Sequence, residues 1–322
     1  MILNLNNYKT LTVALASISL VLFAAACGGS TDESDRSESL RVIASMYPLE
    51  YFAERVGGDR VDVDGVVPAG GDAHDFEPTP GDLRNIAGAD VIIYNGLGFE
   101  SWVDALLGAG DAPDTAVQVS SEELALHFET NEIKLGPGVD GVHETEDLDP
   151  HLWLDPVLAV TQVLAITDGF IASDPEGELL YNSNSDALVA ELVALDVQFS
   201  DALSTCSRDV FVTSHDSFNY LANRYDKDAV GISGINPESE PSPKSLANLS
   251  DAVTEAGIPY VLVSPIDSER LSDTLMRETG IQALPLHSLQ NLTKDQRDAG
   301  ETYFSLMETN LESLQTALGC SE

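Results

Sequence analysis

Basic residues are scarce in this chain of 322 residues. Fifteen lysines and arginines stand against 54 aspartates and glutamates, which gives a formal net charge of −39 at pH 7. Such an acidic surface repels nucleic acid and anionic lipid headgroups. Neither is therefore expected to be a binding partner. Most of these acids are expected to form a solvated coat that keeps the protein soluble.

The short motifs of hydrolases are also absent. The chain contains no His-Glu-x-x-His phrase, the pattern that zinc proteases place on a helix. Ser217 follows His215 and Asp216, but no nucleophile-elbow glycines surround it, and neighbours in sequence seldom have the geometry of a catalytic triad. A zinc hydrolase is therefore disfavoured, and the protein is not expected to be an enzyme.

Long apolar runs are limited to the N-terminus. Residues 11–23 form one, with Lys9 as the only charged residue before it, and the run has the length of a signal peptide rather than of a membrane span. Three alanines then precede Cys27, as in bacterial lipoprotein signals, where that cysteine becomes the lipidated first residue. Ordinary signal cleavage is the alternative. Residues 1–26 are thus predicted to be a signal peptide and residues 27–39 a flexible polar tether, so the protein is expected to work outside the cytoplasm.

Cysteine is almost lacking beyond Cys27, since only Cys206 and Cys320 remain. Export permits a disulfide between them, which would tie the last predicted helix to the start of the second half of the chain. Two free buried thiols are the alternative, and the sequence leaves both open.

Short β-branched runs alternate with helical stretches in two parts of the chain, residues 40–155 and 205–322. This βα rhythm predicts two α/β lobes, each a parallel-rich sheet flanked by helices. The rhythm is interrupted by residues 121–150, a glycine- and acid-rich stretch that is expected to be an exposed loop. Residues 156–204 have helical periodicity without a strand, so we expect them to be a long rigid helical connection between the lobes. A cleft between two such lobes is a usual place for a small ligand.

Four of the six histidines end a predicted strand or lie in a proline-flanked loop phrase: His74, His151, His215 and His287. Two fall in each lobe, and the carboxyl ends of strands are where open α/β sheets bind ligands. A hydrogen-bonded structural role is the commoner explanation for any one of them, but loop histidines scattered at random would not share this placement. Neutral imidazoles that converge from separate segments suit a borderline-soft divalent cation, with Zn²⁺ as the first candidate.

Four phrases carry a resemblance to a known family. They are Ala-His-Asp-Phe-Glu-Pro-Thr-Pro at 73–80, Asp-Pro-His-Leu-Trp-Leu-Asp-Pro at 149–156, Ser-His-Asp-Ser-Phe-Asn-Tyr-Leu at 214–221 and Glu-Pro-Ser-Pro at 240–243. Over roughly residues 40–320 the chain resembles the cluster A-I solute-binding lipoproteins of bacterial metal ABC importers, the zinc and manganese receptors. The resemblance implies two lobes linked by a rigid helix, with the metal held between them.

The resemblance also implies a ligand set. The family's first two ligands match His74 and His151, and its third is His in zinc receptors but usually Glu in manganese receptors; here it is His215. Three imidazoles favour zinc, whereas manganese prefers carboxylate oxygens. The family's fourth ligand is often an Asp at the position of His287, and in some zinc receptors a Glu near Gln290. His287, Gln290 and water therefore stay open, with His287 favoured because structural zinc sites close at four protein ligands.

Four imidazoles would leave the charge of Zn²⁺ uncompensated. We expect carboxylates behind the ligands to accept the second ring N–H and offset that charge. The candidates are the acids nearest to the histidines in sequence: Asp75, Glu77, Asp155 and Asp216. Capping of helix N-termini is the alternative role for Asp155 and Asp216.

These observations favour an extracytoplasmic receptor, anchored by lipid at Cys27, that binds Zn²⁺ as a monomer and delivers it to the membrane permease of an ABC importer. A manganese or iron receptor of the same family, or a metal-dependent surface adhesin, is the alternative.

Overall fold

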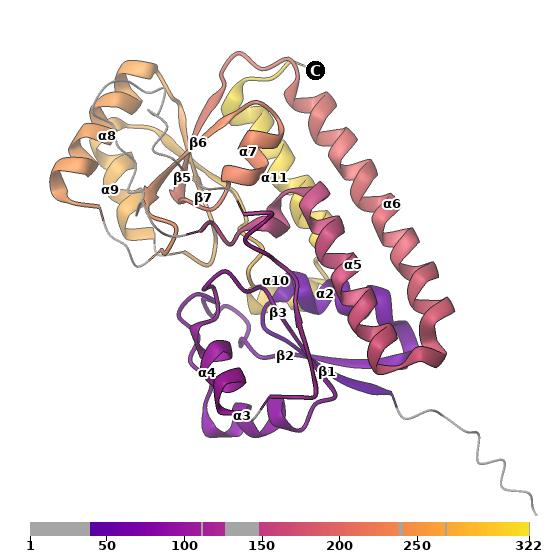
Figure 1. Ribbon diagram of the computed structural model, residues 1–322. Coiled ribbons are helices and arrows are strands. Elements are labelled where there is room, and N and C mark those ends of the chain that lie inside the picture. The colour runs from indigo at the N-terminus through magenta and orange to yellow at the C-terminus, as the bar shows by residue number, and fades with distance from the viewer. Residues whose placement is uncertain (1–38, 111, 126–147, 238–240, 268, 322) are drawn as a thin grey trace, which may run out of the picture. The chain divides into compact units, whose positions relative to one another are not determined.

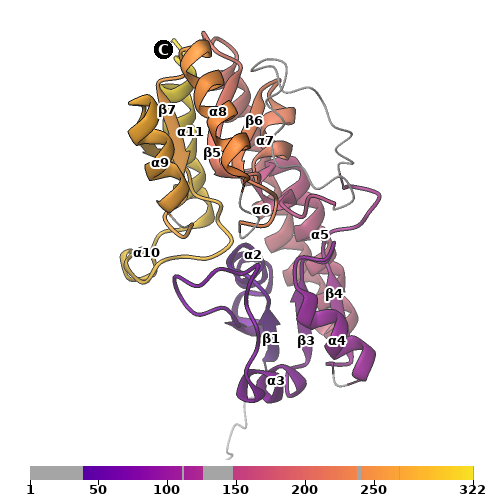
Figure 2. The same ribbon diagram turned by 90° about the vertical axis from the view of Figure 1, so that its left-hand side faces the viewer.

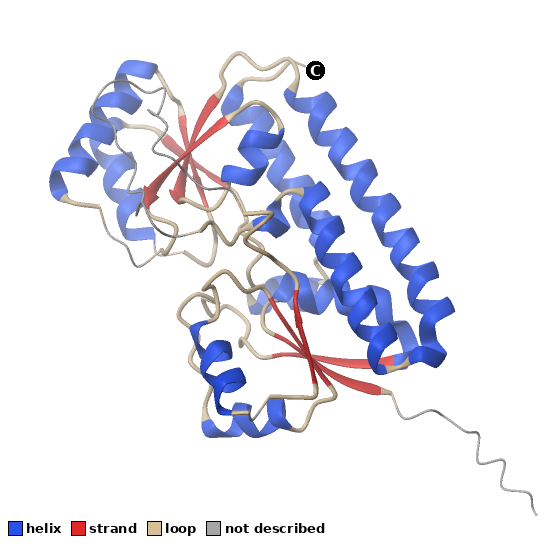
Figure 3. Cartoon of the chain, viewed as in Figure 1, coloured by secondary structure: helices blue, strands red, loops and turns tan. Residues whose placement is uncertain are grey.

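Two separate parallel sheets organise the protein. The structure is a computed structural model that describes residues 39–110, 112–125, 148–237, 241–267 and 269–321. The predicted signal peptide, nearly all of the tether and most of the acidic loop lie outside the described residues. Figure 1 and Figure 3 show the two sheets with helices packed on their faces.

The first sheet has four parallel strands in the order β2-β1-β3-β4. Its strands are β1 (Leu40–Ala44), β2 (Val61–Gly65), β3 (Val91–Tyr94) and β4 (Thr115–Gln118). All four residues of β3 are buried, as expected of an inner strand that helices cover on both faces. The helices of this lobe are α2 (Tyr47–Gly57), α3 (Pro80–Ala87) and α4 (Ser101–Ala109).

The second sheet repeats this plan in the order β6-β5-β7-β8, again with every pair parallel. Its strands are β5 (Val210–His215), β6 (Asp228–Ser233), β7 (Tyr260–Val263) and β8 (Gln282–Pro285). Its helices are α7 (Asn219–Arg224), α8 (Pro243–Ala256), α9 (Glu269–Thr279), α10 (Lys294–Ala299) and α11 (Tyr303–Leu318). The predicted fold class, two α/β lobes with parallel sheets, is confirmed.

The connection between the sheets is a pair of helices, α5 (Pro156–Ser173) and α6 (Glu178–Leu203). The 26 residues of α6 span about 39 Å at 1.5 Å per residue. The chain turns between the two helices at Asp174. Pro175 follows, and a proline disfavours the helical conformation in the residue before it. The Asp174 carboxylate also forms an ion pair with Arg60 at 2.6 Å. The turned view in Figure 2 agrees with Figure 1 that α5 and α6 lie side by side.

One hydrophobic core runs through both lobes and the connecting helices. Phe52 of α2, Phe199 of α6 and Tyr303 of α11 all belong to it. Hydrogen bonds cross the same junction: the Trp153 indole N–H donates to the carbonyl of Ser288 at 2.7 Å, and the Tyr303 hydroxyl donates to the carbonyl of Trp153 at 2.6 Å. The lobes are therefore packed together rather than joined by a free linker. Although α5 is long and apolar enough to cross a membrane by composition, its Val163 and Phe170 side chains lie in this core.

A disulfide joins Cys206, just after α6, to Cys320, just after α11. It lies where the two segments also form a short antiparallel bridge. Of the two alternatives left by the sequence, the structure has the bonded one.

Replacing Cys206 by Ser should lower the free energy of unfolding by about 2–4 kcal/mol, because the bond restricts the unfolded chain across a separation of 114 residues. Denaturant unfolding without reductant measures the loss. Cys320→Ser should give the same loss, and the double variant no more than either single one. Losses that add in the double variant would contradict a bond between these two residues.

Candidate metal centre

His151 is held by the acid two residues before it. The Asp149 Oδ1 atom accepts a hydrogen bond from the backbone N–H of His151 at 2.9 Å and lies 2.7 Å from its Nδ1 atom. Both side chains are fully buried. When Nδ1 donates its proton to the carboxylate, Nε2 presents its lone pair on the other side of the ring, which is the orientation that a metal ligand requires.

His215 has the same kind of support from a different element. It is the last residue of β5, and its Nδ1 atom lies 2.6 Å from Oδ2 of Asp267, in the loop after β7. The Ser214 hydroxyl donates to the same oxygen at 2.5 Å. The Nε2 atom of His215 is buried and has no hydrogen-bond partner among the described residues.

His74 comes from a segment without helix or strand, between β2 and α3. Its backbone N–H donates to Oδ1 of Asp72 at 2.8 Å, which repeats the contact between His151 and Asp149. Its ring packs against Phe99 with 4.4 Å between centroids. Its Nε2 atom lies 3.2 Å from the Nε2 atom of His151.

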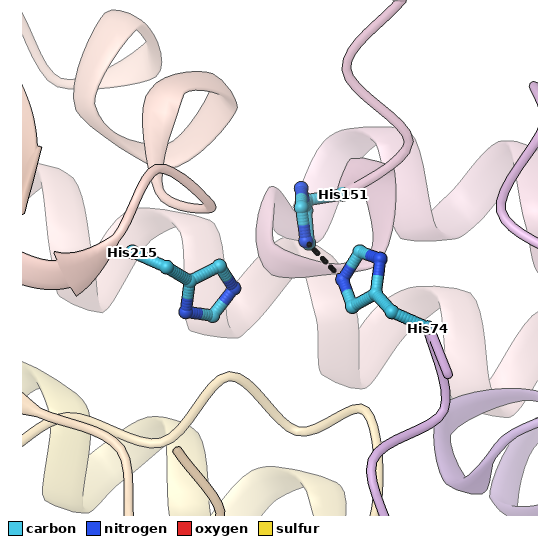
Figure 4. Close-up of side chains that lie close together, drawn as sticks. All are labelled: His74, His151 and His215. Carbon is cyan, nitrogen blue, oxygen red and sulfur yellow. Dashed lines mark hydrogen bonds between the residues drawn. The ribbon is translucent and has the colours of Figure 1, made fainter. Parts of the chain in front are cut away.

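The three imidazoles face one shared space (Figure 4). One nitrogen from each of His74, His151 and His215 can be chosen so that all three lie within 4.8 Å of one another. Two nitrogens bound to one tetrahedral Zn²⁺ at about 2.05 Å would be about 3.3 Å apart. The 3.2 Å between the Nε2 atoms of His74 and His151 matches that separation.

The protonation of the three rings differs. Burial, together with the charges of His151 and His215, holds the pKa of His74 well below its ordinary value. Burial and the charge of His215 do the same to the pKa of His151. Burial also opposes the charged form of His215, but the charge and hydrogen bond of Asp267 outweigh it and raise its pKa. Two of the rings are thus neutral, the form that binds a metal, and the third is held by a carboxylate.

His287, the fourth histidine expected at the site, is not part of the group of three found among the described residues. Among the described residues the cluster contains only three histidines. The Nδ1 atom of His287 accepts from the N–H of Leu289 at 2.9 Å, and its Nε2 atom lies 3.2 Å from Oε1 of Gln296. Both ring nitrogens therefore have partners of their own, and the role of His287 as a fourth ligand stays a prediction. Gln290 is fully buried, and neither polar atom of its side chain has a partner among the described residues.

The acids behind the rings are mostly not those named from the sequence. Asp155 caps the N-terminus of α5 and binds Arg224 at 2.8 Å. Asp216 accepts from the Asn219 amide at 2.8 Å, and its charge acts on the pKa of both His151 and His215. Asp75 and Glu77 line, with His74, a cavity of about 420 Å³.

Sequence reasoning missed Asp149 and Asp267, the two acids that hold the rings. For Asp149 a signal existed, because Asp-x-His occurs at both Asp72–His74 and Asp149–His151, and an Asp side chain readily binds the backbone N–H two residues later. For Asp267 the sequence offers no local signal, since it is 52 residues from His215.

Three imidazoles, brought together from two parallel α/β lobes and held by buried carboxylates, define a two-lobed metal-binding protein of the solute-receptor class. The chain belongs to the family described as ZnuA, zinc-uptake complex component A, periplasmic, whose model matches residues 42–317. The family inferred from the four sequence phrases is confirmed.

Relatives cover nearly the whole chain. It is 34% identical over 303 residues to the high-affinity zinc uptake system protein ZnuA of Bacillus subtilis, covering 92% of this chain and 94% of that protein. It is 33% identical to the zinc-binding lipoprotein AdcA of Streptococcus pneumoniae, of which it spans only 60%. The solved Zn(II)-bound ZnuA-like domain of AdcA superposes with a TM-score of 0.72 at 32% identity, covering 87% of this chain and 99% of that domain. The laminin-binding protein Lmb of Streptococcus agalactiae, described as an adhesin with metal-transporting activity, gives 0.73 at 27% identity over 87% of this chain and 100% of Lmb.

Replacing Asp267 by Asn should weaken the binding of Zn²⁺ by about 10- to 100-fold, because the neutral amide no longer fixes the ring of His215 for a metal. Competition with a chromophoric chelator at constant pH measures the affinity.

Asp155→Asn is the matched control. It should lower stability, since it weakens the α5 cap and the pair with Arg224, but leave zinc affinity close to that of the wild type. Equal losses of affinity in the two variants would contradict the role of Asp267.

Proposed function

We propose that this protein is an extracytoplasmic receptor that binds Zn²⁺ with His74, His151 and His215 and delivers it to the membrane permease of an ABC importer. The observation that carries the proposal is the convergence of three imidazoles, two of them buried and that of His74 partly buried, whose selected nitrogens lie within 4.8 Å of one another. Membership in the zinc-uptake family and the zinc named for its relatives support the same ion and the same task.

The donor set favours zinc over manganese. Imidazole nitrogens suit Zn²⁺ in a tetrahedral shell, whereas Mn²⁺ prefers oxygen ligands and higher coordination numbers. With the nitrogens of His287 engaged, we propose that the fourth position is filled by Gln290 or by water. Gln290 is supported by its burial and by the lack of partners for its amide among the described residues.

Binding and release, rather than catalysis, is the proposed activity. The buried acids behind the rings, Asp149 and Asp267, accept hydrogen bonds from ring N–H groups and backbone, and so orient ligands rather than activate a water. We propose in addition that Cys27 carries the lipid anchor on the outer face of the cytoplasmic membrane, and that the receptor works as a monomer. The lipoprotein name of the relative AdcA supports the anchor.

An adhesin function is the second candidate, because the relative Lmb is described as bifunctional. A deletion strain separates the two. Loss of growth under zinc chelation, restored by added Zn²⁺, is expected of the receptor, whereas loss of surface attachment alone would favour the adhesin.

Replacing any one of His74, His151 or His215 by Ala should reduce zinc affinity by more than ~10- to 100-fold. That range is the loss expected when a residue that only hydrogen-bonds a ligand is replaced. Competition titration of the purified protein with Zn²⁺, and with Mn²⁺ for comparison, measures it. His287→Ala is the matched histidine control and should retain the affinity of the wild type. A loss at His287 as large as at the other three would place it among the ligands, and tighter binding of Mn²⁺ than Zn²⁺ would overturn the choice of metal.

Zinc affinity should fall as the pH drops, because protons compete with the metal for the ring nitrogens. The pKa of His215 is raised, so its proton competes first, at a higher pH than an ordinary imidazole pKa of about 6.5 would give. The pKa values of His74 and His151 lie well below the ordinary value, so they add to the loss only at lower pH. Titrations from about pH 7.5 to about pH 5 should show this decline, and a flat profile would argue against imidazole ligands.

A further inference from the structure

The three histidines differ in how firmly the fold holds them. His215 ends a strand, and His151 precedes a short buried turn of helix and is itself fully buried. His74 lies in a long irregular segment between β2 and α3, and its ring is exposed to a cavity of about 420 Å³. The position of His74 therefore depends on contacts made by its own loop.

Those contacts come from the other lobe. The chain after β8, which we name the crossing segment (residues 286–293), lies against the first lobe, where Gln290 O accepts from the backbone N–H of Tyr47 at 3.3 Å. Leu292 O accepts from the N–H of Gly70 at 2.8 Å. In Figure 1 and Figure 2 the α10 end of this segment lies beside the first lobe.

Asn291 makes the strongest of these connections. Its side-chain amide donates both protons to the loop, one to the carbonyl of Pro68 at 2.6 Å and one to the carbonyl of Gly71 at 2.9 Å. Its Oδ1 atom accepts from the N–H of Leu292 at 2.8 Å and from Arg297 at 3.3 Å. The amide nitrogen thus faces two carbonyl acceptors and the amide oxygen faces two donors. This buried side chain therefore has a single favourable orientation.

The groups that Asn291 binds form a tight turn just before His74. Gly71 N–H donates to Pro68 O at 2.9 Å, and Gly70 has a φ of 79°, a conformation that favours glycine. A Cβ atom on Gly71 would come within 3.0 Å of Pro68 O. The chain then passes through Asp72, whose carboxylate binds the N–H of His74.

We propose that Asn291 is a positioning residue that holds His74 in the metal site from the opposite lobe. The inference rests on the proposed function and adds a route for release. Displacing the crossing segment frees the turn at 68–71 and moves Gln290 with it, so His74 leaves the metal and the imidazoles of His151 and His215 bind it more weakly. A permease that moves this segment can thus discharge the ion without separating the two sheets.

Asn291→Ala tests the proposal in the full chain, with Zn²⁺ as the probe. We expect zinc affinity to fall about tenfold or more, with a faster dissociation rate in stopped-flow release to excess chelator. Asn184→Ala is the matched control, because it also removes an amide-to-carbonyl bond between two elements, to Val56 O at 3.0 Å, but that bond joins α6 to α2 and does not involve the His74 loop. It should leave both the affinity and the dissociation rate unchanged.

A double-mutant cycle separates positioning from general destabilisation. In a His74→Ala background, Asn291→Ala should have no further effect on zinc affinity, because its action passes through that ring. Gly71→Ala, which disturbs the same turn and leaves the Asn291 side chain in place, should weaken binding in the same way and serves if Asn291→Ala does not fold. Additive losses in the cycle, or affinity and dissociation rate equal to those of the wild type in Asn291→Ala, would overturn the proposal. Failure of the wild type to bind zinc, or no effect of His74→Ala, would instead overturn the proposed function.

Discussion

The candidate site depends on three imidazoles, two buried and one partly buried, that lie close to one another at the junction of the lobes. Rings so close cannot all carry a proton, since each charge opposes the next in a site from which water is largely removed. The fold keeps two of them neutral by burial and places a carboxylate behind His151 and another behind His215. The geometry proposed for metal ligation is therefore already present in the scaffold without an ion.

Most of the fold was predictable because each lobe follows one repeating rule. Short β-branched runs between helical stretches predicted two α/β lobes with parallel-rich sheets, and the structure has one four-stranded parallel sheet in each. The helix α10 has little signal in the sequence, since five of its six residues are polar and the sixth is Ala299. Its formation depends on a capping box at Thr293 and on contacts with the first lobe through Arg297.

The candidate site was predictable only in part, for a physical reason. Because ligands collect at strand ends, both His215 and His287 were expected at one site, and the group of three imidazoles among the described residues includes His215 but not His287. The rule predicts the position of a residue's backbone but not the direction of its side chain. At His287 the Asn310 side chain holds the backbone on both sides and the ring faces α10. Asp267 was beyond prediction, because its approach to His215 depends on how the loop after β7 folds back over the sheet.

The shared core has a consequence for how the protein is made. Tyr303 of α11 stacks near Tyr51 and packs edge-on against Phe52 of α2, with ring centroids 6.3 and 5.0 Å apart. The helix α2 belongs to the lobe that is synthesised first. It thus completes its packing only with α11, one of the last segments to leave the secretion channel. Maturation of this receptor is therefore expected to be a late, whole-chain event, during which the export machinery or a holdase has to shield an unfinished apolar surface.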